Sequence, residues 1–435
     1  MIQTKILQNG VRVVFERVSN LQKVSFCCRV MAGSQNEIRE QNGIAHYLEH
    51  CLFLGTSSRT EEEIQLIERH SGTIFNAETG QEYIQLTTDV LPEDFALVFD
   101  VYADMIQNPT FPPDKLEREK GIVLTEISEF LDDNDNCANN LMFNAAYKRN
   151  PLGLPIEGTL KTVKNITRDD LISYYQKWFR PENLIISVAG NTDFDTVVRY
   201  CEQAYGQFTN NTPVPTKTPS PYLGGDRREE QDTETNTVRM AFQGVPIHHF
   251  RDYMCASLYA GVISLMAFDE LRIKQGLLYG IQAENCAFED SAVFYLSFSA
   301  ELPKQETIIK ETCRLLRQTV TDIPSFYIEA AKKQMKLDMP SNDGSLDEKI
   351  SSNLFDMTYF NHVTPPEDVL SELDSITPAE IQQIAGRILN SRLAFAVLGN
   401  TRKTPTYDQI NKWLNGNEQK TATGPVLMPQ PSIQR

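Results

Sequence analysis

The stretch that decides the fold reads Gly43-Ile44-Ala45-His46-Tyr47-Leu48-Glu49-His50-Cys51-Leu52-Phe53-Leu54-Gly55-Thr56. Its two histidines stand at positions i and i+4, with a glutamate at i+3. On a helix these positions share one face, because 3.6 residues complete a turn. Two neutral imidazoles on one face form a pair of metal ligands, and a carboxylate beside them can accept a proton from a metal-bound water. The inverted order H-x-x-E-H therefore indicates a zinc hydrolase.

The alternative interpretation is an amphipathic helix with two surface histidines, because short motifs also arise by chance. The chain has only six histidines, however, and two of them fall in this motif with a glutamate between them. This concentration favours the metal site.

A third metal ligand must come from elsewhere, because catalytic zinc usually has three protein ligands and one open position for water. The best candidate stretch is 117–129, which we expect to be a helix and which contains Glu119, Glu126 and Glu129. Glu119 and Glu126 are seven residues apart, so they share one face two turns from each other. Apolar neighbours of Glu126 predict a partly buried face, where a carboxylate needs a cation or a hydrogen-bond partner. The residues alone do not choose among the three glutamates, which can also be solvated.

The H-x-x-E-H stretch, with Glu126 placed 76 residues after His50, resembles the inverzincin peptidases of family M16. This family includes pitrilysin, insulin-degrading enzyme and mitochondrial processing peptidase, and the chain looks like a short, two-domain M16B-like member. The resemblance implies that His46, His50 and Glu126 bind one Zn²⁺ per chain. It also implies that Glu49 is the general base and that Glu119 is a supporting carboxylate.

Two further segments of the first half match the same family in order. Residues 75–82 resemble the edge strand beside the zinc, which implies that Asn76 and Ala77 contact the substrate backbone. Residues 151–159 resemble the family segment P-L-G-x-P-I-x-G-T.

A segment of the second half, residues 271–279, resembles the family pattern L-R-x-K-x-G-L-x-Y. The resemblance implies that Arg272 and Tyr279 hold and polarise the substrate carbonyl. Composition alone favours a surface ion pair and a core aromatic instead. The sequence departs from the family at 258–266, where it has one glycine and relatives often have several.

The chain repeats itself at the scale of a domain. Ile166-Thr167 precedes an expected helix and an apolar strand that ends in Gly-Asn-Thr, and Ile376-Thr377 precedes the same pattern about 209–210 residues later. We therefore predict an α+β fold of two duplicated domains, and the resemblance implies a mainly antiparallel sheet packed with α-helices in each. The first domain, 1–208, holds the zinc site; the second, 232–435, lacks a metal motif and carries the Arg/Tyr pair. A Pro-rich linker, 209–231, joins them.

Composition restricts the partners and the location. The net charge of -17 disfavours nucleic acid and favours basic over acidic peptides. No run of about 18 apolar residues is present, so we expect no membrane span. Eight scattered cysteines without a C-x-x-C pair indicate reduced thiols. No signal or transit segment is visible, so we expect a cytoplasmic protein.

The expected function is a zinc-dependent metalloendopeptidase that cleaves unfolded peptides or small proteins. Larger relatives close four such domains around the substrate, whereas this chain has two. The resemblance therefore implies a homodimeric chamber in which Arg272 and Tyr279 of one subunit reach the zinc of the other. The alternatives are a heterodimer with a related chain, a non-catalytic assembly subunit, and a metal enzyme with a small-molecule substrate.

Overall fold

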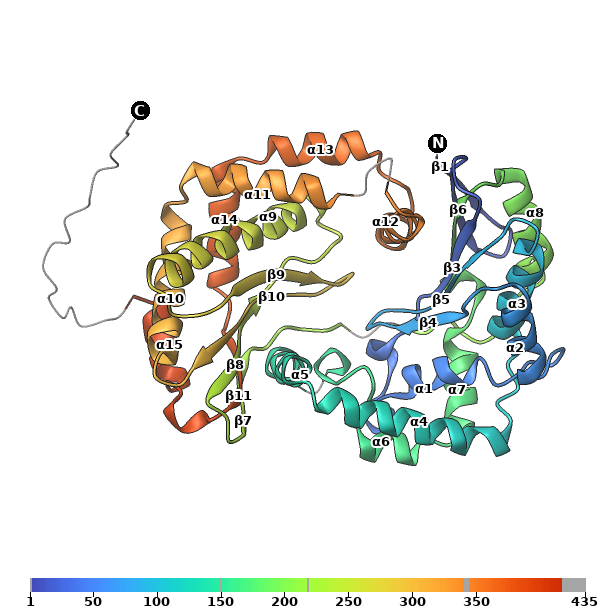
Figure 1. Ribbon diagram of the computed structural model, residues 1–435, viewed down its shortest axis with the longest axis horizontal. Helices are drawn as coiled ribbons and strands as arrows, with labels where there is room; N and C mark the ends of the chain where they lie inside the picture. The colour runs from blue at the N-terminus through green and yellow to red at the C-terminus, as the bar shows by residue number, and fades with distance from the viewer. Residues whose placement is uncertain (1, 149, 217–218, 340–343, 417–435) are drawn as a thin grey trace, which may run out of the picture.

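Two β-sheets organise the computed structural model, which describes residues 2–148, 150–216, 219–339 and 344–416 (Figure 1). The first sheet has the order β1-β2-β6-β3-β5-β4 and comprises β1 (Ile2–Ile6), β2 (Arg12–Arg17), β3 (Val24–Val30), β4 (Asn76–Thr79), β5 (Ile84–Val90) and β6 (Leu184–Gly190). The second has the order β7-β11-β8-β10-β9 and comprises β7 (Gly225–Glu230), β8 (Thr235–Gln243), β9 (Ile281–Ala287), β10 (Ala292–Glu301) and β11 (Ala394–Gly399).

Helices cover both sheets. Those of the first half are α1 (Ile44–Cys51), α2 (Glu61–His70), α3 (Phe95–Gln107), α4 (Pro113–Leu131), α5 (Asn134–Tyr147), α6 (Leu160–Asn165), α7 (Arg168–Trp178) and α8 (Phe194–Tyr205), with short turns η1 (Ser34–Asn36), η2 (Arg39–Gln41), η3 (Pro151–Gly153) and η4 (Pro181–Asn183). Those of the second half are α9 (Phe250–Ala267), the π-helix η5 (Phe268–Lys274), α10 (Gln305–Thr321), α11 (Ser325–Asp338), α12 (Leu346–Tyr359), α13 (Pro366–Ser375), α14 (Pro378–Leu389), the turn η6 (Thr401–Lys403) and α15 (Tyr407–Leu414).

The two sheets share one topology, which confirms the predicted duplication and the α+β class. In each sheet one pair is parallel, β2 with β6 and β7 with β11, and the remaining pairs are antiparallel. The repeated threonines, Thr167 and Thr377, each cap a helix that precedes the strand β6 or β11. The first sheet adds β1, which forms the expected hairpin with β2.

The halves exchange one helix each, a feature that the sequence did not predict. Helix α5 belongs to the first half but packs on β8 and β11, whereas α12 belongs to the second half but packs on β6 and β3 (Figure 1). The two helices occupy the same place in the duplicated element order, so the exchange is reciprocal. Strand β3 is consequently buried on both faces: Cys28 faces the core of the first half, and Cys27 faces α12.

The boundary between the halves also differs from the expected one. The expected linker ended at residue 231, but Gly225–Glu230 form β7, which pairs with β11 inside the second sheet. The sequence does not distinguish this strand from the Pro-rich linker before it, because an extended linker and an edge strand both favour extended backbone.

One helical stretch of the described chain, Phe250–Lys274, is long and apolar enough to cross a membrane by length and composition. It comprises α9 and η5, and α9 packs against β9, α11 and α14. Of the apolar 18-residue part of this stretch, 61% is buried inside the structure, as is typical of a core helix.

Because α12 packs on the first sheet, we predict that shortening a buried side chain of α12 destabilises the first half. Leu354 is 1% exposed and packs in the cluster with Val14, Cys27 and Ile185. We expect Leu354→Ala to reduce the free energy of unfolding by about 2–5 kcal/mol, because a cavity remains in the α12–sheet contact. Urea denaturation measures this. Leu337→Ala, at a leucine that is 85% exposed, should change the free energy by less than about 0.5 kcal/mol; equal effects would contradict the packing argument.

Helix α1 begins at a tight backbone contact. Gly43 has φ +92°, and a Cβ there would lie 2.6 Å from the carbonyl oxygen of Glu157 and 2.8 Å from Cα of Gly158. Gly158 itself has φ +80°. Only glycine suits both positions, because they combine a left-handed backbone with the closest approach of two chains. The segment 151–159 thus fixes the start of α1.

A buried carboxylate caps the same end of α1. Glu37 accepts hydrogen bonds from the backbone N–H groups of Gly43 and Ala45 and from the Asn42 side chain, each at 2.9 Å. These bonds satisfy donors that the first turn of a helix leaves unpaired. Burial raises the pKa of Glu37 to about 8, although the hydrogen bonds from Ala45, Asn42 and Gly43 oppose this rise.

The raised pKa of Glu37 predicts a pH-dependent stability. The folded protein retains the Glu37 proton up to about pH 8, whereas the unfolded chain releases it near 4.5. Stability from this group is therefore fully present below pH 4.5 and declines as pH rises through this window. We expect the free energy of unfolding to fall from pH 5 to 8.5 by about 1 kcal/mol or more in excess of the fall in Glu37→Gln. Parallel slopes for the two proteins in urea titrations would contradict this assignment.

Candidate metal and catalytic site

Two helices bring the predicted ligands together. Helix α1 carries His46 and His50 on one face, and α4 carries Glu126. On another face of α1, the Tyr47 hydroxyl donates a 2.7 Å hydrogen bond to the carbonyl oxygen of Leu116 in α4. This bond fixes how the two helices sit against each other, and thus how the ligand atoms meet.

His46, His50 and Glu126 form the one cluster in the described chain with spacing suited to a metal ion. Nε2 of His46 lies 3.3 Å from Nε2 of His50, and Oε2 of Glu126 lies 3.6 Å and 3.1 Å from these two atoms. Ligands about 2.0–2.1 Å from a tetrahedral zinc ion would lie roughly 3.3 Å apart. The donor atoms and their spacing therefore fit Zn²⁺.

Glu119 fixes the orientation of His50. Its Oε1 lies 3.1 Å from Nδ1 of His50, while its other oxygen lies 3.6 Å from the Arg118 guanidinium. A proton held on Nδ1 by this carboxylate leaves the Nε2 lone pair free for a metal. Nδ1 of His46, by contrast, is buried without a hydrogen-bond partner among the described residues.

The two histidines differ in their affinity for protons. Burial, and then the charge of His50, lower the pKa of His46 to about 4, so its imidazole is neutral near pH 7. Burial also lowers the pKa of His50, but the hydrogen bond that His50 donates to Glu119 and the charges of Glu126 and Glu49 outweigh it and raise the pKa above 6.5. A proton on His50 therefore competes with a metal more strongly than one on His46.

Glu49 lies beside the cluster without belonging to it. Its side chain is 9% exposed, and its Oε2 accepts a 2.6 Å hydrogen bond from the hydroxyl of Thr79 on β4. Burial raises the pKa of Glu49, and the hydrogen bond from Thr79 opposes the rise. A carboxylate with its pKa moved toward neutrality can both accept and return a proton.

Strand β4 lies at the edge of the first sheet, next to α1. Asn76 begins this strand and is exposed, while Ala77 is half-buried and packs on the core. In the described chain β4 pairs only with β5, so its second edge has backbone groups available for another extended chain.

Arg272 and Tyr279 meet each other but not the metal cluster. The Arg272 guanidinium stacks 4.3 Å from the Tyr279 ring centre and donates to the Tyr279 carbonyl oxygen. Tyr279 is 84% exposed. Both line a hollow of about 420 Å³ together with strands of the second sheet, and its lining includes no residue of the cluster.

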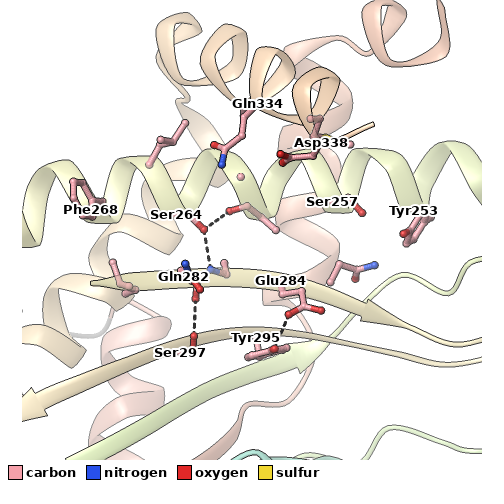
Figure 2. Close-up of a pocket in the computed structure, with 18 residues that line it drawn as sticks. Tyr253, Ser257, Ser264, Phe268, Gln282, Glu284, Tyr295, Ser297, Gln334 and Asp338 are labelled. Atoms are coloured by element: carbon pink, nitrogen blue, oxygen red, sulfur yellow. Dashed lines mark hydrogen bonds between the residues drawn. The ribbon is translucent and has the colours of Figure 1, made fainter. Parts of the chain in front are cut away.

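The second half holds a cavity of about 670 Å³ between α9, α11 and the edge strand β9. Figure 2 shows Ser257 on α9, Glu284 on β9 and Asp338 on α11 around this space. The cavity therefore has the same setting as the cluster of the first half, which lies between α1, α4 and the edge strand β4.

Residue positions support this correspondence. Glu119 and Glu126 stand seven and fourteen residues after Pro112, the N-cap of α4, and Ala331 and Asp338 stand at the same distances after Pro324, the N-cap of α11. Gly261 faces Ala331, since a Cβ on Gly261 would lie 3.2 Å from the Cβ of Ala331. In the first half His50 faces Glu119 in the same way. Ser257 and Gly261 are four residues apart, like the histidines. The second half thus has small side chains at the two histidine positions and a carboxylate, Asp338, at the position of Glu126.

Two residues of the site were missed as contributors in the sequence analysis. Thr79 lay in a recognised segment, but its bond to Glu49 depends on the placement of β4 beside α1. Glu37 precedes Gly43 by six residues, which is no capping-box spacing, so only the folded loop brings it to the helix start.

Comparison with known families agrees with this architecture. The model described as "Insulinase (Peptidase family M16)" matches residues 12–160, and "Peptidase M16 inactive domain" matches residues 165–335. An uncharacterized zinc protease of Rickettsia felis is 29% identical over 401 residues, which cover 90% of this chain and 96% of that protein. The mitochondrial-processing peptidase subunit beta of Saccharomyces cerevisiae is 26% identical, over 95% of this chain and 94% of that protein.

Solved structures share the fold. A peptidase M16 inactive domain from Pseudomonas fluorescens has a TM-score of 0.84 and 18% identity, and covers 93% of this chain and 99% of its own. A protease from Helicobacter pylori has a TM-score of 0.84 and 19% identity, with coverages of 92% and 99%. With both family models matched in succession along one duplicated fold, the chain belongs to peptidase family M16, whose members include zinc metalloproteases.

Proposed function

We propose that this chain is a zinc-dependent endopeptidase that cleaves unfolded peptides, with His46, His50 and Glu126 holding one Zn²⁺. The observation that carries the proposal is the convergence of three ligand atoms within 4.8 Å of one another, directly beside a buried carboxylate and an open sheet edge. Zinc, when bound, supplies Lewis acidity and lowers the pKa of a water molecule toward about 7.

Other residues of the chain transfer protons, orient the metal ligands and bind the substrate. Glu49 accepts the proton of the attacking water and returns it to the leaving amine, and Thr79 holds Glu49 in place for both transfers. Glu119 keeps His50 in the tautomer that presents Nε2 to the metal. An extended substrate adds to the edge of β4, where Asn76 and Ala77 contact its backbone. The net charge of -17 favours basic substrates.

We further propose that the working unit is a dimer. Arg272 and Tyr279, the proposed groups for the substrate carbonyl, line a hollow that contains no residue of the metal cluster. A second subunit would bring its own pair to the cluster, and two identical chains would form two such sites. The mitochondrial-processing peptidase subunit beta is by its name one subunit of a larger assembly, so a heterodimer with a related chain, or a non-catalytic subunit role, is the second candidate.

The role of Glu49 predicts a large loss of activity. We expect Glu49→Gln to slow cleavage of a library of unstructured peptides by about 10²-fold or more at equal zinc content, because the base is removed while the ligands stay. Mass spectrometry of the products measures this. The matched control is Glu129→Gln, an exposed glutamate of α4. Wild-type activity in Glu49→Gln would refute the proposed base; no activity in either protein would favour a missing partner chain.

The dimer predicts complementation between two inactive variants. Tyr279→Phe should lose about 10²–10³-fold in kcat, because it lacks a donor to the developing oxyanion. After subunit exchange, an equal mixture with Glu49→Gln should recover about a quarter of wild-type activity, because half of the dimers then contain one intact site. Gel filtration and cleavage assays measure exchange and recovery. No recovery despite demonstrated exchange would show that Tyr279 acts within its own subunit, and wild-type activity of Tyr279→Phe alone would show that it has no role.

A further inference from the structure

A third pocket, of about 690 Å³, opens where the connection between the halves passes the end of α5. Its wall includes Arg39 from η2, Lys148 at the C-cap of α5, and Arg227 from β7. These three residues come from the first half, the exchanged helix and the second sheet. A ligand in this pocket would therefore touch all three parts of the interlocked fold.

The charge of this pocket is opposite to that of the chain. Its wall has three cationic side chains and no carboxylate, although the chain has 58 acidic and 41 basic residues. Among the described residues, no carboxylate lies within ion-pair distance of Arg39, Lys148 or Arg227; the carboxylate of Asp226 pairs with Arg228 instead. Three like charges around one space repel each other unless an anion lies among them.

One of the cations, Arg227, is held in place before any ligand arrives, and the backbone of Lys148 is strained. Arg227 donates from Nε to Oδ1 of Asn144 at 2.6 Å and from Nη1 to the carbonyl oxygen of Asp226 at 2.9 Å. Lys148 has φ +53° and ψ -106°, a backbone conformation that a residue with a side chain rarely adopts. Such strain persists where the surrounding structure enforces it, and it is concentrated at ligand sites.

The remaining wall combines apolar side chains with Asn144, Tyr147 and Asn150. Pro151, Pro219, Pro221 and Leu223 line it, and Asn150 joins two of its segments by donating to the carbonyl oxygen of Pro219 at 3.2 Å. A volume of this size is typical of small-molecule sites that combine apolar walls with a few charged groups. The pocket thus offers three cations for a multiply charged group and apolar side chains for an organic part.

We propose that this pocket binds a phosphorylated small molecule, with its phosphoryl group between Arg39, Lys148 and Arg227. A phosphoryl group carries up to two negative charges and several acceptor oxygens, and the Arg guanidinium matches it with paired donors. The ligand joins η2, which precedes the capped start of α1, to the second sheet, so binding stabilises the arrangement of the halves. This site is independent of the proposed peptidase activity.

Isothermal titration of the full chain with AMP, pyrophosphate, inorganic phosphate and adenosine tests the proposal. We expect saturable binding of AMP with one site per chain, and none of adenosine, because adenosine lacks the phosphoryl group. Arg227→Gln and Lys148→Gln should each weaken AMP binding about tenfold or more, while Arg227→Lys retains part of it. Tighter binding of AMP than of inorganic phosphate would place the organic part on the proline wall; equal binding would assign recognition to the phosphoryl group alone.

Controls separate this site from general charge and from metal. Lys333→Gln removes one exposed charge on α11 and should leave AMP binding within about twofold. Binding should persist after zinc is stripped with a chelator, and circular dichroism should show that the variants are folded. Absence of binding in the wild-type protein, equal binding of adenosine, or equal weakening by Lys333→Gln would overturn the proposal.

Discussion

The contact between α1 and α4 is the constraint on which the rest of the site depends. It holds two imidazole nitrogens and a carboxylate oxygen 3.1–3.6 Å apart, an arrangement of three electron-rich atoms that is unfavourable unless a cation or a proton lies among them. The surrounding fold resists relief of this repulsion: Tyr47 ties the helices together, and Gly43 leaves no room for the start of α1 to shift. The ligand atoms are therefore already in place before a metal binds, so little of the binding free energy is lost in ordering them.

Much of this site could be predicted from periodicity alone. The i, i+3, i+4 spacing of His46, Glu49 and His50 and the seven-residue spacing of Glu119 and Glu126 fix faces of helices, and those faces meet as expected. The roles of the two glutamates of α4 needed the resemblance, because helix spacing places both on one face without saying which reaches the metal atoms and which reaches Nδ1 of His50. The structure separates them by distance, with Glu126 at Nε2 and Glu119 at Nδ1.

The exchange of α5 and α12 could not be predicted in the same way. An amphipathic pattern states that one face of a helix is buried, but not against which sheet. The consequence is physical: cutting the chain into residues 1–208 and 232–435 would expose β8 and β11 in one piece and β3 and β6 in the other. The two halves are duplicates in topology but not independent folding units.

The duplication also relates the metal cluster of the first half to the cavity of the second half. Both lie between a helix, its partner after a Pro N-cap and an edge strand, and they differ in a few side chains: histidines in the first half, Ser257 and Gly261 in the second. The second half lacks the two histidines but has an edge strand, β9, beside its cavity, as the first half has β4 beside the cluster. The two halves also differ in how firmly their proposed functional residues are packed. The residues of the metal cluster are held by the packing of α1 against α4, whereas Tyr279 stacks on Arg272 and is still 84% exposed, which leaves its ring open to cover by a partner. A second subunit that supplies this cover would complete both sites at once.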